Sequence, residues 1–139
     1  MAVAFNKINQ FVADVGNKIH NLGGDALKVM LTNVAPVAGT SKVFSDLTEI
    51  TAQNGYSAGG AAVPSNAYAQ VGGLATLTGS NVVFTGSGGS FGPFRYAVLY
   101  NSTPGSQPLV GWWDYGSSIS VNNGETFTVN LSGGILTLQ

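Results

Sequence analysis

Hydrophobic residues recur at spacings of three and four over the first 22 residues. The apolar positions are Phe5, Ile8, Val12, Val15, Ile19 and Leu22, which have the period of one face of an amphipathic helix. Gly23-Gly24 would end such a helix. Gly16 interrupts the pattern, so residues 18–22 would alternatively pair as a strand with the next one across a turn at 21–25. We predict a helical or arm segment over residues 1–24, docked on the remaining β domain or on a neighbouring subunit.

From residue 26 onward, short runs of β-branched and aromatic residues alternate with Gly, Asn, Ser and Pro, which is typical of strands and turns. Residues 126–131 alternate apolar and polar side chains, as a half-buried strand does. Tight turns are expected at Asn123-Gly124 and Gly133-Gly134. This number of short strands predicts one mainly β domain, an antiparallel sandwich or barrel. The predicted strands span residues 26–32, 43–51, 68–71, 74–78, 81–85, 94–100, 109–115, 119–121, 126–131 and 135–138.

Two of these strands, 94–100 and 109–115, are equally long and flank a single loop, so they predict an antiparallel hairpin. Symmetric pairing brings Arg95 opposite Asp114, and we predict a structural ion pair between them. A slip of one residue would separate the two charges and exchange the faces. The opposed pairs would be Phe94 with Tyr115, Arg95 with Asp114, Tyr96 with Trp113, Ala97 with Trp112, Val98 with Gly111, Leu99 with Val110 and Tyr100 with Leu109.

Charge is scarce in this chain. Asp, Glu, Lys and Arg make up 8% of the 139 residues and the net charge is −1, whereas about 25% is usual. This composition excludes charge-rich disorder, and it argues against nucleic acid and anionic membranes as partners, because both need clustered Lys and Arg. Most of the charges lie within residues 1–50, and only Arg95, Asp114 and Glu125 follow. With little repulsion between copies, self-association is expected.

The sequence offers little catalytic chemistry. Gly88-Gly89-Ser90-Phe91-Gly92 matches the nucleophile-elbow pattern, but Pro93 and a strand follow where a helix is needed, and the single histidine, His20, precedes the serine. Asp46 and Glu49 form a weak candidate for a pair of acid and base groups. The chain has no cysteine, so disulfides and thiolate metal sites are excluded. We predict no catalytic residue, no metal and no cofactor.

The N-terminus shows no signal-peptide pattern, and no apolar stretch approaches the roughly 20 residues that span a bilayer. A protein made and retained in the cytosol, or released by lysis, is therefore expected. The apolar N-terminal segment, the Gly-rich loops 55–60 and 86–92 and the aromatic hairpin are the predicted contact regions. An outward tryptophan of the pair 112–113 would alternatively stack on a sugar ring. The candidate interface residues are Phe5, Ile8, Phe11, Tyr56, Phe91, Phe94, Trp112 and Trp113.

Several blocks stand in a fixed order along the chain, namely Asp25–Asn33, Asn54–Gly60, Gly92–Asn101, Gly111–Gly116 and Gly124–Phe127. Together they resemble small virion structural proteins of tailed bacteriophages, most of all capsid cement (head-decoration) proteins. The resemblance runs from about Phe5 to Leu138. It implies a jelly-roll-like β-sandwich that binds the outer face of an icosahedral shell and ties neighbouring capsid subunits together, with no catalytic residue to carry over.

The expected function is therefore that of a non-enzymatic cement protein on the capsid surface of a virion, made in the host cytoplasm. Its expected partners are further copies of itself, as a dimer or trimer, and the major capsid protein of the phage. Many modest contacts repeated over a shell suit such a role. A phage tail or fibre component, and a carbohydrate-binding β-sandwich that uses the aromatic hairpin, are the alternatives. A small hydrolase using Ser90 and His20 is a third hypothesis, for which we expect no turnover.

Overall fold

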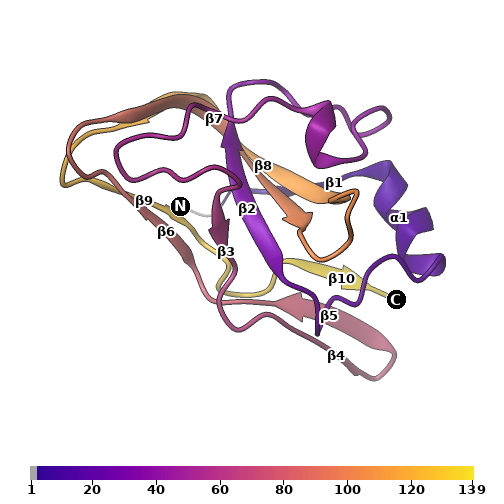
Figure 1. The fold of residues 1–139 in the computed structure, drawn as a ribbon. Helices are drawn as coiled ribbons and strands as arrows, with labels where there is room; N and C mark the ends of the chain where they lie inside the picture. Colours follow the sequence, from indigo (N-terminus) through magenta and orange to yellow (C-terminus); the bar gives the residue numbers. More distant parts are fainter. Residues whose placement is uncertain (1–2) are drawn as a thin grey trace.

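The computed structural model describes residues 3–139 (Figure 1). Strands hold 45% of the chain and helices 8%, and the sheets are antiparallel, which confirms the mainly β class. A short 3-10 helix covers Phe44–Asp46. The other elements are β1 (Phe5–Lys7), α1 (Asn9–Gly16), β2 (Leu27–Thr32), β3 (Ala61–Ala62), β4 (Ala67–Val71), β5 (Leu74–Thr78), β6 (Val82–Thr85), β7 (Phe91–Asn101), β8 (Leu109–Val121), β9 (Thr126–Val129) and β10 (Leu136–Leu138).

The main layer is a five-stranded sheet in the order β1-β8-β7-β2-β3. Its centre is β2 and β7, which pair from Leu27 opposite Asn101 to Thr32 opposite Tyr96. Residues of β2 are buried on both faces apart from half-buried Lys28, as expected for a central strand covered from two sides.

The second layer is the two-stranded sheet of β6 and β9. Aromatic rings fill the space between the layers. Phe84 of β6 lies 5.8 Å from the ring of Tyr56, and Phe127 of β9 meets Phe94 of β7 edge-on at 4.8 Å. Such tilted and edge-to-face contacts are the preferred geometry of packed aromatic rings. The two layers form a sandwich-like core, whereas the jelly-roll topology stays a prediction.

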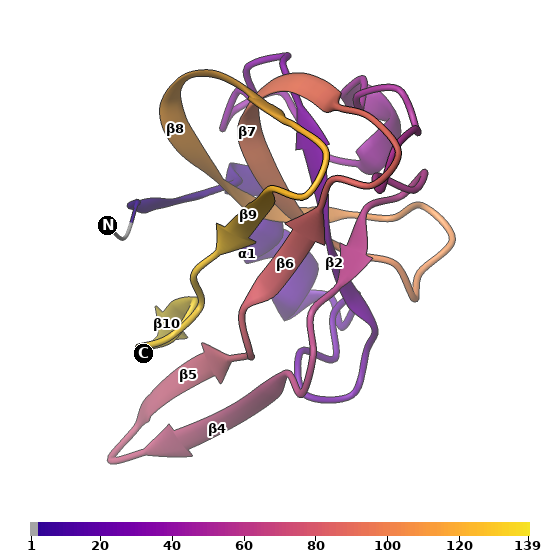
Figure 2. The ribbon, with the colours of Figure 1, turned by 90° about the vertical axis from the view of Figure 1, so that its left-hand side faces the viewer.

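A third sheet, β10-β5-β4, continues from one end of this body. In both ribbon views the β4–β5 hairpin projects away from the remaining strands (Figures 1 and 2). Its turn is Gly72-Gly73, where both residues have positive φ, 60° and 87°. That is the conformation of a two-residue type I′ hairpin turn, which glycine adopts without steric cost.

The N-terminal segment differs from the predicted continuous helix. Residues 5–7 form a strand, β1, that pairs with β8, and the helix covers only Asn9–Gly16. Phe11 is buried in place of the predicted Val12, which is 54% exposed, whereas Ile8 and Leu22 of the predicted apolar face are buried. The helix ends at Gly16 because Lys18 has a φ of 65°, which a helix cannot contain. Residues 18–22 are not a strand either.

The β7–β8 hairpin is present, but its register is shifted from the predicted one. Ala97 faces Trp113 and Leu99 faces Gly111, because the ladder skips Val110 between Leu99 and Tyr100. A β-bulge of this kind inserts one unpaired residue into one strand. Strand β7 extends beyond the predicted range at both ends, and β8 extends beyond it at its C-terminal end, so the predicted strand 119–121 belongs to β8.

The predicted strand 43–51 is wrong. In its place stands the 3-10 turn Phe44–Asp46, flanked by single bridges from Val43 to Pro108 and from Glu49 to Thr32. The carboxylate of Asp46 accepts the backbone N–H groups of Lys42, at 2.8 Å, and Val43, at 3.1 Å. These local hydrogen bonds compete with strand pairing, which is the usual effect of aspartate near a turn.

Candidate functional site

Most of the predicted interface residues are part of the protein's own core. Burial in the single chain leaves these side chains without a surface that a partner could reach, so the expectation that they form contacts is corrected. Their apolar character, which suggested an interface, stabilises the monomer. The buried six, each no more than 4% exposed, are Ile8, Phe11, Tyr56, Phe91, Phe94 and Trp113.

Phe5 and Trp112 keep part of their surface exposed. The ring of Phe5 lies on Trp113 at 4.9 Å, and both Phe5 and Trp112 pack against the edge of the core. Trp112 is half-buried, so it is the member of the tryptophan pair that retains an accessible face. Phe5 and Trp112 therefore remain as candidate contact residues.

The structure does not bring Ser90 and His20 together. Ser90 directly precedes β7, while His20 Nδ1 accepts a hydrogen bond at 3.1 Å from the side-chain amide of Asn101, the last residue of β7. Eleven residues of extended chain separate Ser90 from Asn101, the partner of His20, by up to roughly 36 Å at about 3.3 Å per residue. A nucleophile and its base need hydrogen-bond distance, so these two residues do not form a catalytic pair.

Asp46 and Glu49 act in separate structural networks. Asp46 caps its own turn, and these backbone hydrogen bonds lower the pKa of its carboxyl group. Glu49 accepts the hydroxyl of Tyr56 at 2.7 Å and the backbone N–H of Gly59 at 3.0 Å. Burial raises the pKa of the Tyr56 hydroxyl, which keeps it a neutral donor. Glu49 therefore anchors the loop 55–60, and the two carboxylates do not share a site.

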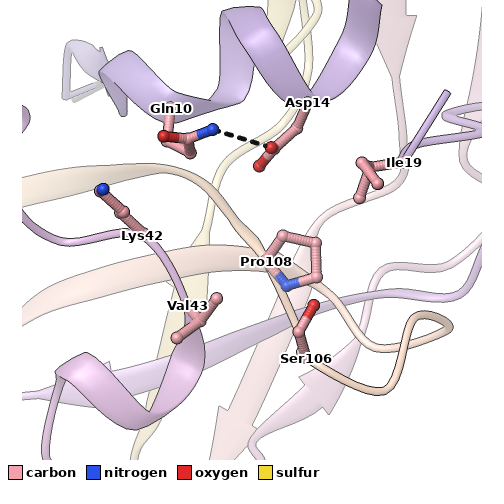
Figure 3. Close-up of a pocket in the computed structure, with 7 residues that line it drawn as sticks. All are labelled: Gln10, Asp14, Ile19, Lys42, Val43, Ser106 and Pro108. Carbon is pink, nitrogen blue, oxygen red and sulfur yellow. Dashed lines mark hydrogen bonds between the residues drawn. The ribbon is translucent and has the colours of Figure 1, made fainter. Parts of the chain in front are cut away.

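Within residues 3–139, no group of three or more His, Cys, Asp or Glu side chains is placed to hold a metal ion. A depression of about 330 Å³ lies between α1 and the segments around residues 42 and 108 (Figure 3). Gln10 donates to Asp14 at 3.1 Å on its helical wall. The depression is open, with Lys42 as the single cation among its lining residues. It offers one carboxylate and one ammonium group and no nucleophile beside a base.

The β4–β5 hairpin is the most exposed apolar element of the described chain. Every residue of β4 is exposed, and Val71 at the turn is 84% exposed, with Leu74 opposite it at 41%. At the base of the hairpin, Leu77 is fully buried and fixes β5 to the core. We define the projecting residues Ala67–Thr78 as the hairpin surface. An exposed apolar surface on a small protein marks an interaction site more often than an isolated apolar residue does.

The hairpin surface carries no charge. No Asp, Glu, Lys or Arg lies between Glu49 and Arg95 in the sequence. Both strands of the hairpin were predicted from the sequence, but their exposure was not, because apolar runs of this kind usually indicate burial. The long uncharged stretch together with Gly72-Gly73 was the signal that could have identified a projecting contact element.

The geometry defines a sandwich-like antiparallel β protein with a projecting, uncharged hairpin. Comparisons with protein-family models, curated proteins and solved structures find no match to the chain. Of the helices in residues 3–139, none has the length and apolar character needed to cross a membrane. The functional proposal below therefore depends on the site itself and on the resemblance described above.

Proposed function

We propose that this protein is a non-enzymatic capsid cement protein of a tailed bacteriophage, which binds the outer surface of the shell and stabilises contacts between major capsid subunits. The observation that carries the proposal is the exposed and uncharged hairpin surface on a well-packed β body. The resemblance of the sequence blocks to cement proteins gives the class of partner. A phage tail or fibre component, and a sugar-binding module, are the alternatives.

The scarcity of charge fits attachment to a protein shell. Apolar contacts and neutral hydrogen bonds are not screened by salt, whereas contacts between exposed charges weaken beyond the Debye length of about 8 Å at physiological ionic strength. Repetition of a modest contact over a symmetric shell also raises the total binding strength without a single strong site. The Ser90 loop and His20 have no role in this proposal.

The test is to add the purified protein to phage capsids that lack it and to measure retention after sedimentation. We expect saturable binding to the outer surface, retained in about 1 M NaCl because no charge pair carries it, and a higher temperature of capsid disruption. Electron microscopy of the decorated particle would locate the added density. Absence of the chain from purified virions of its phage, or density on the tail alone, would overturn the proposal.

A further inference from the structure

The outer edge of β4 is open. Strand β4 is the last strand of the sheet β10-β5-β4, and no strand of residues 3–139 lies on its other side. Natural edge strands are commonly protected from further pairing by lysine, proline, a bulge or a covering loop. The five residues of β4, Ala-Tyr-Ala-Gln-Val, contain neither lysine nor proline and pair with β5 without a bulge.

The covering loop protects only the first part of this edge. Asn66 donates its side-chain N–H to the carbonyl of Leu22 at 2.8 Å, and a Cβ atom placed on Gly23 would lie 3.5 Å from the backbone nitrogen of Tyr68. The loop at residues 22–25 therefore lies beside the start of β4. The part toward the turn, Ala69–Val71, extends past this loop (Figure 2).

The turn geometry shows which backbone groups point outward. In a two-residue hairpin, the residues that flank the turn are hydrogen-bonded to each other. Here these are Val71 and Leu74, so Ala69 also bonds across to Thr76, and the intervening Gln70 directs its backbone N–H and C=O away from β5. The position of Tyr68 agrees, because its backbone nitrogen faces the loop at Gly23.

The charge distribution favours a second copy of this chain as the occupant of the edge. A two-fold axis brings each residue near its own counterpart, so any charge close to the axis would face a like charge. No charged residue occurs from Ile50 to Phe94, so neither strand of the β4–β5 hairpin brings a charge to the axis. Antiparallel pairing of β4 with itself also continues the antiparallel order of β10-β5-β4.

We propose that β4 pairs with β4 of a second copy, antiparallel about a two-fold axis at Gln70, to form the continuous sheet β10-β5-β4-β4-β5-β10. Ala69 then faces Val71 of the second copy, and the two Gln70 residues exchange their backbone hydrogen bonds. Stable complexes bury roughly 1,200–2,000 Å², which an edge this short does not reach. We therefore expect a dimer that dissociates on dilution, with a Kd of roughly 10–100 μM.

A single cysteine tests the axis directly, because the chain contains no other. Opposed residues in a hydrogen-bonded antiparallel pair have Cα atoms about 5.5 Å apart, within the range that a disulfide spans. We expect the Gln70→Cys variant to form a disulfide-linked dimer under mild oxidation at about 100 μM, above the lower end of the expected Kd range. The matched control is Val83→Cys, which lies on β6 and is 52% exposed. Equal cross-linking of both variants would overturn the proposal.

Sedimentation of the unmodified chain over a concentration series supplies the second test. Val71→Lys places two like charges beside the axis and is expected to weaken the dimer at least about tenfold, a change of about 1.4 kcal/mol. Val83→Lys, also on an exposed strand position, leaves the dimer intact. Both sites are exposed, so circular dichroism should show folded protein in each case. A monomer at all concentrations, or equal weakening by both variants, would refute the pairing.

This pairing would add a self-contact to the proposed cement function, but its test needs only the purified chain. Capsid retention is measured separately with Val71→Lys and Val83→Lys. A dimer without capsid binding would refute the cement function alone. Capsid binding by a chain that stays monomeric at every concentration would refute the two-fold pairing alone.

Discussion

Arg95 and Asp114 form a bidentate ion pair although they are not opposite each other in the β7–β8 ladder. Arg95 Nε donates to Asp114 Oδ1 at 2.8 Å, and Nη2 donates to Oδ2 at 3.1 Å. The residue opposite Asp114 is Tyr96, and residues 115–118 bulge out of β8 beside Arg95. The long arginine side chain spans the one-residue offset that the skipped Val110 creates, so the predicted pair is present in a register that we expected to exclude it.

This pair gives the first prediction. The Arg95 guanidinium holds the pKa of the Asp114 carboxyl group below its ordinary value, with a further contribution from the backbone N–H of Gly116. In the Arg95→Met variant we expect the pKa of Asp114 to rise but to stay below that of a free aspartate, because the Gly116 hydrogen bond at 2.8 Å remains. Carboxyl chemical shifts followed through a pH titration measure both values. Lys42→Met is the control and should leave the pKa of Asp114 unchanged. An unchanged pKa of Asp114 in Arg95→Met would show that Arg95 is not the cause of the lowered pKa.

The β7–β8 hairpin also shows what the sequence could predict. Matching strand lengths around one loop and the only opposite charges in that region were sufficient for the hairpin and the ion pair. The pattern could not reveal the bulges, because a skipped residue such as Val110 is apolar like its neighbours and leaves the local alternation nearly intact. Register therefore depended on tertiary packing, including the contact of Phe5 with Trp113 at 4.9 Å.

The candidate site was only partly predictable for a related reason. Hydrophobicity alone does not separate a core residue from an interface residue, so Phe94, which is fully buried, and Val71, which is 84% exposed, look equivalent in the sequence. What distinguishes them is how far each strand extends past the body of the domain. The absence of charge from residues 50–94 was visible, but its location on a projecting hairpin required the fold.

The second prediction concerns the protonation of His20. Asn101 fixes the tautomer, because its Oδ1 accepts the backbone N–H of Thr103 and its Nδ2 donates to Asp25 at 2.6 Å. Nδ2 therefore also faces His20 Nδ1, at 3.1 Å, as a donor. The ring must accept at Nδ1 and carry its proton on Nε2, which is buried and has no hydrogen-bond partner within residues 3–139. The ring also packs on Phe11 at 5.1 Å.

Burial lowers the pKa of His20, opposed by the charges of Asp14 and Asp25. The unfolded chain thus binds more protons than the folded one between the lowered pKa and the ordinary value of about 6.5. We expect the free energy of unfolding to be highest above about pH 6.5 and to decrease as the pH falls through this window. Urea unfolding between pH 5 and 7.5 measures it, and His20→Gln should flatten the profile. An equally steep profile in that variant would assign the effect to other groups.

The third prediction separates two glycines that both have positive φ. Gly60, at 81°, lies where an added Cβ would overlap the carbonyl of Val29 in the central strand, whereas nothing lies within 4 Å of a Cβ at Gly72 in the exposed turn. Gly72→Ala should cost only the left-handed conformation, about 1–2 kcal/mol. In Gly60→Ala the added Cβ must also push β3 away from β2. We therefore expect a loss of about 3 kcal/mol or more in the free energy of unfolding. Chemical denaturation of both variants gives the comparison. Equal losses in the free energy of unfolding would show that the backbone moves away from the Val29 carbonyl at little cost, which would contradict the prediction.

The last prediction distinguishes the two adjacent tryptophans. Trp113 is 4% exposed and packs against Phe5, which belongs to the edge strand β1. Its replacement by alanine leaves a cavity under β1, and we expect a loss of about 3–5 kcal/mol in the free energy of unfolding. Trp112 points to the other face and is half-buried, so Trp112→Ala should cost less than about 2 kcal/mol, since less apolar area returns to water.

Protection of the β1 amide groups from hydrogen exchange supplies the control for this comparison. Trp113→Ala should release the amides of residues 5–7 before those of β2, because β1 contacts the sheet only through β8, and local opening follows the loss of its packing. Trp112→Ala should leave the order of exchange unchanged. If Trp112→Ala destabilised the chain more than Trp113→Ala, the side of β8 that faces the core would be the opposite one, and Trp112 would no longer be a candidate contact residue.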